Sequence, residues 1–161
     1  MDIISHALIG WIICLIADAS GKEIFWIILF SIIPDIVLIP AYIKLGRENK
    51  RFLWIAKNKD WSGETLKYPF LAALYNTTHS LFFLVIIVYP AIKIFNLPNL
   101  IFAAYLLHIA TDILSHKGEW AIKLFYPFKL KINGLSDVWA WPFYLMAIAW
   151  ITLITIIEIL I

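Results

Sequence analysis

The chain has 161 residues, of which 63% are hydrophobic, and its mean hydropathy is +0.87. A soluble domain is usually about half apolar, so this composition excludes an ordinary water-soluble domain and predicts an integral membrane protein. The 13 basic residues barely exceed the 11 acidic residues, so the net charge indicates no class of partner. The single cysteine, Cys14, excludes an intrachain disulfide and a cysteine zinc cluster, and we interpret it as a buried free thiol.

Five hydrophobic segments follow one another along the chain, and we expect each to form a membrane helix. They cover residues 3–17, 24–43, 69–95, 97–116 and 142–161. About 20 apolar residues span the hydrocarbon core of a bilayer, and none of these segments alternates as a barrel strand would. The first lacks the basic start and the cleavage site of a signal peptide, so we expect a retained helix. The predicted fold class is all-α: a polytopic transmembrane bundle of about five helices, forming one membrane domain over residues 1–161.

Two polar stretches, residues 44–67 and 117–138, separate the hydrophobic segments and hold 7 and 4 of the 13 basic residues. Aromatic residues are interleaved with these charges. In a membrane protein this pattern favours amphipathic segments lying on anionic lipid headgroups over a nucleic-acid surface. Five spans would place both stretches and the N-terminus on one side. The positive-inside rule then predicts a cytoplasmic N-terminus and an external C-terminus.

Six histidine and aspartate side chains interrupt the apolar segments, and on this topology all of them fall in the cytoplasmic half of the bundle. Such groups are costly in a membrane and indicate a functional site. Imidazole and carboxylate groups are the usual ligands of zinc, manganese and iron. We therefore expect one or two divalent ions, zinc first, with manganese or iron as alternatives. The candidate metal ligands are His6, Asp35, His79, His108, Asp112 and His116.

The spacing within the fourth segment suggests how the ligands are shared. His108 and Asp112 are four residues apart, so both can coordinate one ion from the same helix face. On a continuing helix, His116 would lie about 12 Å from His108, too far to share that ion. Either Asp112 bridges two ions, or His116 has a separate role. A two-metal site would suit ester and phosphoester hydrolysis, with Asp35 or Asp112 as the catalytic carboxylate that orients water.

Each of these residues also has a simpler interpretation. His6 and His116 could be solvated histidines at the headgroup region and at a helix end. Asp35 could cap a broken helix. His79 could be hydrogen-bonded internally within a polar kink, and residues 108–112 could form interhelical hydrogen bonds.

In chain order these residues resemble the YdjM-like family of membrane-bound, metal-dependent hydrolases, also described as LexA-regulated inner-membrane proteins. The matching motifs are SHALIG around His6, IPDI around Asp35, THS around His79, and the His108-x-x-x-Asp112 helix, followed by Gly118 and by YPF at 126–128. The resemblance covers most of the chain. It implies a metal-dependent hydrolase distantly similar to zinc phospholipases C and P1-type nucleases, with His6, Asp35, His79, His108 and Asp112 as metal ligands.

The chain departs from that family pattern at two motifs. Val37 and Leu38 replace the second Asp and the His of Pro-Asp-x-Asp-His, and Leu74 and Tyr75 replace the His-Arg before Thr-His-Ser. His116 could substitute for a missing ligand. The phosphate clamp that the arginine would provide could come instead from Arg47, Arg51 or Lys117.

We therefore expect a hydrolase of the cell inner membrane that acts on a phosphoester or ester of a lipid or amphiphile at the cytoplasmic leaflet. Its partners would be that substrate and anionic headgroups, with no nucleic acid. Two alternatives use the same residues. One is a transporter or proton relay, although the chain lacks inverted repeats and the polar groups stop in one half of the bilayer. The other is a noncatalytic membrane protein with a structural metal site.

Overall fold

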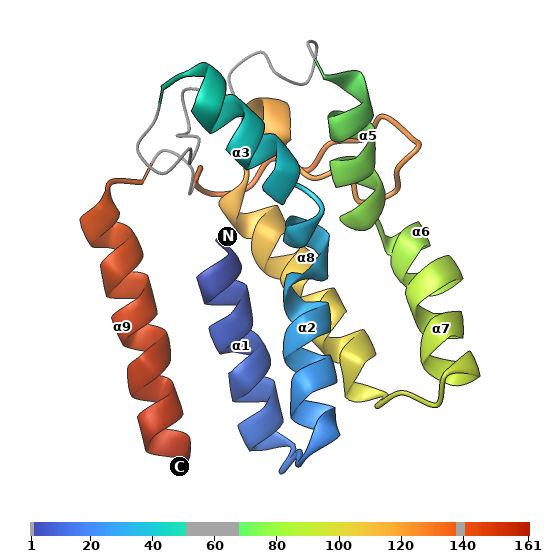
Figure 1. Ribbon diagram of the computed structural model, residues 1–161, viewed down its shortest axis with the longest axis vertical. Helices are drawn as coiled ribbons and strands as arrows, with labels where there is room; N and C mark the ends of the chain where they lie inside the picture. Colours follow the sequence, from blue (N-terminus) through green and yellow to red (C-terminus); the bar gives the residue numbers. More distant parts are fainter. Residues whose placement is uncertain (1, 51–67, 138–140) are drawn as a thin grey trace.

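The computed structural model describes residues 2–50, 68–137 and 141–161. In these ranges the protein is all-helical, and its only β pairing is an isolated bridge between Ile122 and Ile132. This confirms the predicted all-α class. The longest helices run alongside one another (Figure 1): α1 (Ile3–Ile16), α2 (Lys22–Ile36), α8 (Leu100–Ser115) and α9 (Phe143–Leu160).

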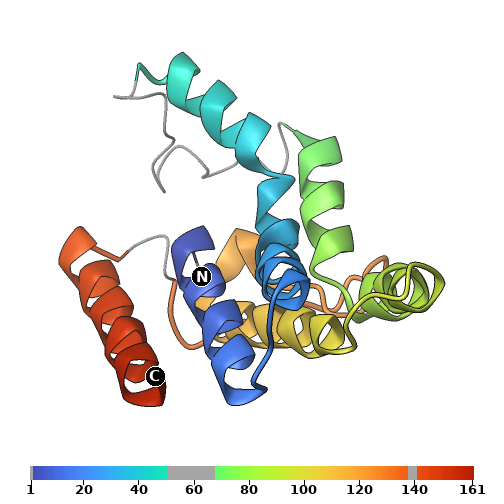
Figure 2. The ribbon, with the colours of Figure 1, turned by 60° about the horizontal axis from the view of Figure 1, so that its bottom comes forward.

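The second hydrophobic segment is divided into two helices. α2 continues through Pro34 and ends at Ile36, and α3 (Ile39–Glu48) follows at an angle of 41° with a proline in its first turn. Pro34 lacks the backbone N–H that would continue the ladder, which weakens the helix at this point. Figure 2 shows α3 leaving α2 and projecting from the other helices. Asp35 therefore lies in the last turn of α2, and the alternative interpretation that it caps a helix is wrong, because Leu38 is the N-cap of α3 and no side chain caps that helix.

The third segment also breaks, at His79 and Ser80. α5 (Pro69–Thr78) ends there, and α6 (Leu81–Phe83), a π-helical turn (Leu84–Val88) and α7 (Tyr89–Ile94) follow, with a bend of 60°. Ser80 has an extended backbone, and its hydroxyl accepts a hydrogen bond from Phe83 N at 3.2 Å. This serine N-cap restarts the helix in a new direction. The polar kink that the simpler interpretation of this segment expects is thus present.

The predicted five membrane spans are not confirmed. Among the described helices, α9, with 18 residues, is the only single helix long and apolar enough to cross a membrane. Up to three spans result if each bent pair, α2 with α3 and α5 with residues 81–94, counts as one. α1 and α8 are apolar but have only 14 and 16 residues. The breaks and polar residues that build the site thus also shorten the helices.

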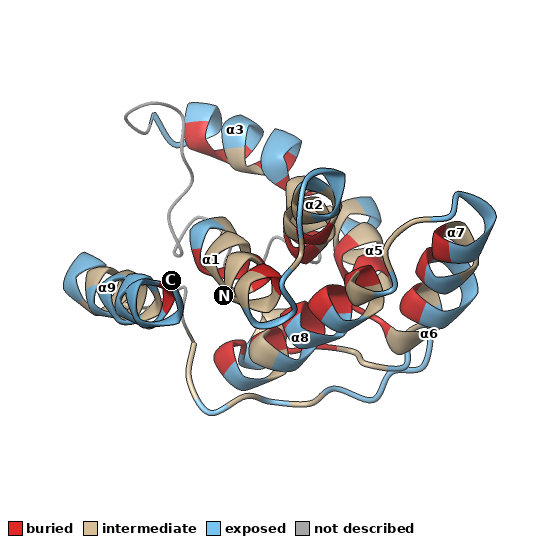
Figure 3. Cartoon of the chain, turned by 90° about the horizontal axis from the view of Figure 1, so that it is seen from below, coloured by how far each residue is buried: buried red, intermediate tan, exposed pale blue. Residues whose placement is uncertain are grey.

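The buried faces of α1, α2 and α8 turn toward one another, as the colours of Figure 3 show. The apolar core around this interface includes Ile27 on α2, Ile101 and Ile109 on α8, and Leu84 of the π-helical turn. α9 lies at the edge and packs mainly against α1, and Trp150 Nε1 donates to Asp2 Oδ1 at 3.1 Å. Its remaining surface is largely exposed and apolar, as expected for a helix that contacts lipid.

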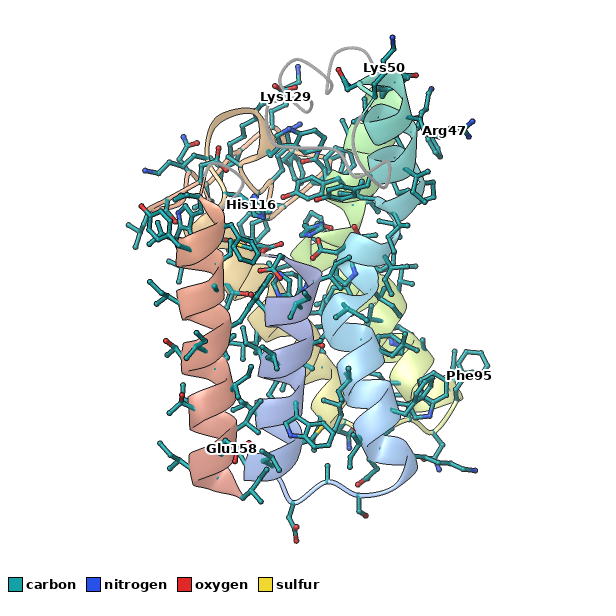
Figure 4. All side chains as sticks on the ribbon, turned by 60° about the vertical axis from the view of Figure 1, so that its left-hand side comes forward. Arg47, Lys50, Phe95, His116, Lys129 and Glu158 are labelled. Carbon is teal, nitrogen blue, oxygen red and sulfur yellow. The ribbon has the colours of Figure 1, made fainter. Side chains whose placement is uncertain are left out.

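Most of the described basic residues gather at the end of the bundle that carries α3, although Lys22, at the start of α2, and Lys93, in the last turn of α7, lie toward the other end. Arg47, Lys50 and Lys129 lie at this end near His116 in Figure 4, whereas Glu158 lies toward the opposite end. Burial, reinforced by repulsion from Lys131 and Lys129, lowers the pKa of Lys123. Most of the first basic stretch, residues 51–67, and residue 138 of the second lie outside the described residues, so their predicted interfacial character stays a prediction.

Candidate metal centre

The six predicted ligands come from four helical regions and meet at one end of the bundle. His6 lies in the first turn of α1 and Asp35 in the last turn of α2. His79 directly follows α5, and α8 carries His108 and Asp112 and is followed by His116. Asp35 is 7% exposed, and the other five residues are at most 1% exposed. The solvated interpretations of His6 and His116 are therefore wrong.

Asp112 is the centre of the cluster, because all four histidines approach its carboxylate. His6 Nε2 and His116 Nε2 lie 3.0 and 3.4 Å from Oδ1. His79 Nε2 and His108 Nε2 lie 3.1 and 3.3 Å from Oδ2. The two oxygens therefore face two different pairs of imidazoles.

Asp35 supplies a second carboxylate. Its Oδ1 lies 3.6 Å from His79 Nε2, and its Oδ2 lies 3.7 Å from His6 Nε2. Its Oδ2 is buried and has no hydrogen-bond partner among the described residues. A buried carboxylate oxygen in this state is costly unless a cation compensates it.

Backbone carbonyls hold the rings of His79 and His108. His79 Nδ1 lies 2.8 Å from Tyr75 O, and His108 Nδ1 lies 2.7 Å from Ser31 O. A carbonyl oxygen only accepts, so in each neutral ring Nδ1 carries the proton and Nε2 presents a lone pair. The two Nε2 atoms are only 3.2 Å apart. Two lone pairs facing each other and a carboxylate repel, and a cation between them removes that repulsion. Histidines that bind a metal are held by a carbonyl in this same way.

The spacing of these donor atoms fits a metal ion. Asp35, His79, His108 and Asp112 each offer one atom, and the four atoms lie within 4.8 Å of one another. Four of the six separations run from 3.1 to 3.6 Å: those from His79 Nε2 to both carboxylates and to His108 Nε2, and that from His108 Nε2 to Asp112. Ligands of a tetrahedral zinc ion, with bonds of about 2.0–2.1 Å, are about 3.3 Å apart. The buried His/Asp group could therefore hold a metal ion without a large rearrangement.

The backbone of His116 departs from the prediction that this residue continues the α8 stripe. α8 ends at Ser115, and His116 adopts an extended conformation with φ −120° and ψ 133°. The segment that returns past the end of α8 fixes it there: Gly134 N donates to His116 O at 2.8 Å, and Leu135 N donates to Leu114 O at 2.9 Å. A Cβ on Gly134 would lie 2.4 Å from Ile113 O, so only glycine permits this close approach. The His116 side chain nevertheless reaches Asp112.

Several residues that orient the cluster were not predicted from the sequence. The carbonyls of Ser31 and Tyr75 hold two rings, and Tyr105 Oη donates to Thr78 O at 2.7 Å, beside the break that presents His79. Gly10 allows α1 to approach Ser31 on α2, because a Cβ there would lie 2.5 Å from Ser31 Oγ. Small residues at a contact between membrane helices are the one sequence signal that could have indicated this pair.

The described structure contains a cavity along α3 and another between α1, α8 and α9. The larger, of about 550 Å³, runs along α3 and touches none of the six candidate ligands. The smaller, of about 250 Å³, lies between α1, α8 and α9 and is mainly apolar. Its wall includes Ser5 and Ser115, the neighbours of His6 and His116 in the chain, and Ser115 Oγ donates to Asp112 Oδ1 at 3.4 Å.

Fold and site together define the class: an α-helical membrane protein with a buried histidine–aspartate cluster at one end of its bundle. The profile of the YdjM inner membrane protein family matches residues 1–160, so the chain belongs to this family. No curated protein and no solved structure matches the chain. The family resemblance is thereby confirmed, whereas the expected distant similarity to zinc phospholipases C and P1-type nucleases has no support.

Proposed function

We propose that this protein is a membrane-embedded, metal-dependent hydrolase whose substrate is a phosphoester or ester of a lipid or amphiphile. The observation that supports it most directly is the convergence of the His79 and His108 Nε2 atoms on the Asp112 and Asp35 carboxylates, with both rings oriented by backbone carbonyls. Zinc suits this set of nitrogen and oxygen donors, and manganese or iron could also occupy it.

A divalent ion bound here would supply Lewis-acid chemistry, polarising the attacked group and lowering the pKa of water. The two aspartates would hold the cluster and orient the reacting groups. Asp112 is wholly buried and contacts all four histidines, so its role is to hold the cluster together. Asp35 is the least buried member and is the carboxylate better placed to orient a water molecule or a substrate proton.

The surroundings of the cluster support an amphiphilic substrate. The 250 Å³ cavity has mainly apolar walls, against which an acyl chain could lie. Its lining also includes the hydroxyls of Ser5 and Ser115 beside the cluster, which could contact a polar group of the substrate. Exposed basic residues at the same end, such as Lys50 and Lys129, would attract an anionic headgroup. By the positive-inside rule we place this end of the bundle at the cytoplasmic leaflet of the inner membrane, with the N-terminus inside and the C-terminus outside.

A structural metal site is the second candidate, and the near-complete burial of five of the six residues favours it. A closed metal site stabilises the fold without leaving a position for substrate. The third hypothesis, a proton relay, is less well supported. The described core beyond the cluster, which includes Ile27, Leu84 and Ile101, is apolar and offers no carboxylate or imidazole to carry a proton across the bilayer.

The test is hydrolysis by the purified, zinc-loaded protein. Vesicles of equal parts phosphatidylglycerol and phosphatidylethanolamine would be followed by ³¹P NMR, and 4-nitrophenyl esters of phosphate and of fatty acids by absorbance. We expect turnover that a chelator abolishes, that Asp35→Asn lowers by at least about 100-fold, and that Cys14→Ala leaves unchanged. A metal-loaded, folded protein that cleaves none of these esters would favour the structural site.

A further inference from the structure

We propose that the cluster binds two divalent ions, with both Asp35 and Asp112 bridging them. The first ion would be held by the four-residue group already described, through His79, His108 and one oxygen of each carboxylate. The second would be held by His6, His116 and the other oxygen of each carboxylate. This inference rests on the metal centre of the proposed function, and it does not depend on hydrolysis.

The division of contacts between oxygens carries the argument. His79 Nε2 faces Asp112 Oδ2 and Asp35 Oδ1, whereas His6 Nε2 faces Asp112 Oδ1 and Asp35 Oδ2. Each carboxylate therefore presents one oxygen to the first group and its other oxygen to the second. A carboxylate that bridges two ions binds them through different oxygens, which is the arrangement observed here.

Three separations within the second group are similar to those of the first. His6 Nε2 lies 3.0 Å from Asp112 Oδ1 and 3.7 Å from Asp35 Oδ2, and His116 Nε2 lies 3.4 Å from Asp112 Oδ1. These separations bracket the value of about 3.3 Å between ligands of one tetrahedral zinc ion. Among the described residues, the set of four donors that fits one ion includes neither His6 nor His116. Two histidines thus remain for a second ion.

Hydrogen bonding alone explains the second group poorly. Asp112 Oδ1 would have to accept from His6 Nε2, His116 Nε2 and Ser115 Oγ together, while Asp35 Oδ2 has no hydrogen-bond partner among the described residues. A cation bound to His6, His116 and both carboxylates would be coordinated by Asp112 Oδ1 and by Asp35 Oδ2. It would therefore compensate both the crowded oxygen and the oxygen without a hydrogen-bond partner.

The charge balance of such a centre indicates a class of substrate. The two carboxylates neutralise one divalent ion, and the four imidazoles are neutral when they bind metal. A second ion therefore leaves two excess positive charges in a buried site, of which a bound hydroxide would neutralise only one. This favours a phosphoester over a neutral carboxylic ester.

The number of ions is tested by loading the full-length protein in detergent with Zn²⁺, removing free metal, and measuring zinc per chain by mass spectrometry. We expect two ions per chain in the wild type and one in His6→Gln and in His116→Gln. Cys14→Ala should keep two, since its thiol lies in the apolar core away from the cluster. With Mn²⁺, electron paramagnetic resonance should show an exchange-coupled pair in the wild type and an uncoupled ion in both variants.

Saturation of the folded wild type at one ion, or two ions retained in both variants, would overturn the proposal. His116 lies beyond the end of α8, so His116→Gln tests the proposal even if His6→Gln fails to fold. Two ions without turnover of any ester would leave this inference standing and refute the hydrolase. Turnover by a protein that binds a single ion would refute this inference and leave the hydrolase standing.

Discussion

At the residue scale, Asp112 connects the parts of the site. Its i,i+4 relation to His108 was predicted from the sequence, and the structure places their side chains 3.3 Å apart. The sequence could not reveal which oxygen faces which ring, because His6 and His79 reach Asp112 from other helices. Nor could it reveal the orientation of His108, because the carbonyl that fixes this ring belongs to Ser31 on α2.

Tyr105→Phe tests whether a buried hydrogen bond positions His79. Its hydroxyl donates to Thr78 O at the break after α5, and both residues are buried. We expect a loss of about 1 kcal/mol of stability, since a buried acceptor loses its donor, and weaker zinc affinity because the break that presents His79 loosens. Thermal unfolding in detergent and competition with a zinc chelator measure the two effects. Phe102→Leu, a change on the same helix away from the cluster, is the control. Equal zinc affinity in the wild type and in Tyr105→Phe would contradict the account.

At the element scale, the breaks in two helices build the site. The sequence predicted five apolar segments and a polar kink at residues 76–80, and both features correspond to the observed helices. It did not predict that α2 would continue past Pro34 or that α8 would end before His116. Those ends depend on long-range contacts, such as the bond from Gly134 N to His116 O, which no local pattern encodes.

The close contact of α1 with α2 gives a prediction at this scale. A Cβ on Gly10 would lie 2.5 Å from Ser31 Oγ and 3.0 Å from Ser31 Cβ. Gly10→Ala should therefore cost about 1–3 kcal/mol by overpacking, and it should lower zinc affinity because the Ser31 carbonyl orients His108. Adding Ser31→Gly removes the obstructing side chain and should restore much of the zinc affinity.

Thermal unfolding and zinc titration of the single and double variants provide the comparison. Ser31→Gly alone controls for the cost of glycine within a helix, about 1 kcal/mol. If Gly10→Ala binds zinc as tightly as the wild type, α1–α2 packing does not position His108.

At the scale of the whole molecule, one end of the bundle combines the cluster, the described basic stretches and the N-terminus, and α9 carries the C-terminus toward the other end (Figure 1). The sequence predicted this shared end from the order of polar groups along the segments. The number of spans could not be established in the same way, because the segments contain bends and short helices whose lengths do not match a bilayer.

Cysteine labelling in intact cells tests the proposed orientation. The only native cysteine, Cys14, is buried, so Cys14→Ala provides a background for single cysteines at Lys129 and Glu158. These residues lie toward opposite ends of the bundle (Figure 4). We expect a membrane-impermeant maleimide to label Glu158→Cys but to label Lys129→Cys only after the membrane is permeabilised. The opposite pattern would place the basic end outside and refute the cytoplasmic assignment.

The central claim is that the buried histidine–aspartate cluster binds metal, and the most direct test compares zinc bound by the wild type and by Asp112→Asn. Asp112 contacts all four histidines, so replacing one of its oxygens with an amide should remove bound zinc while the chain stays folded by circular dichroism. We predict at least one tightly bound zinc per wild-type chain and essentially none in the variant. A folded wild-type protein that binds no divalent ion, or an Asp112→Asn protein that binds as much as the wild type, would contradict the account.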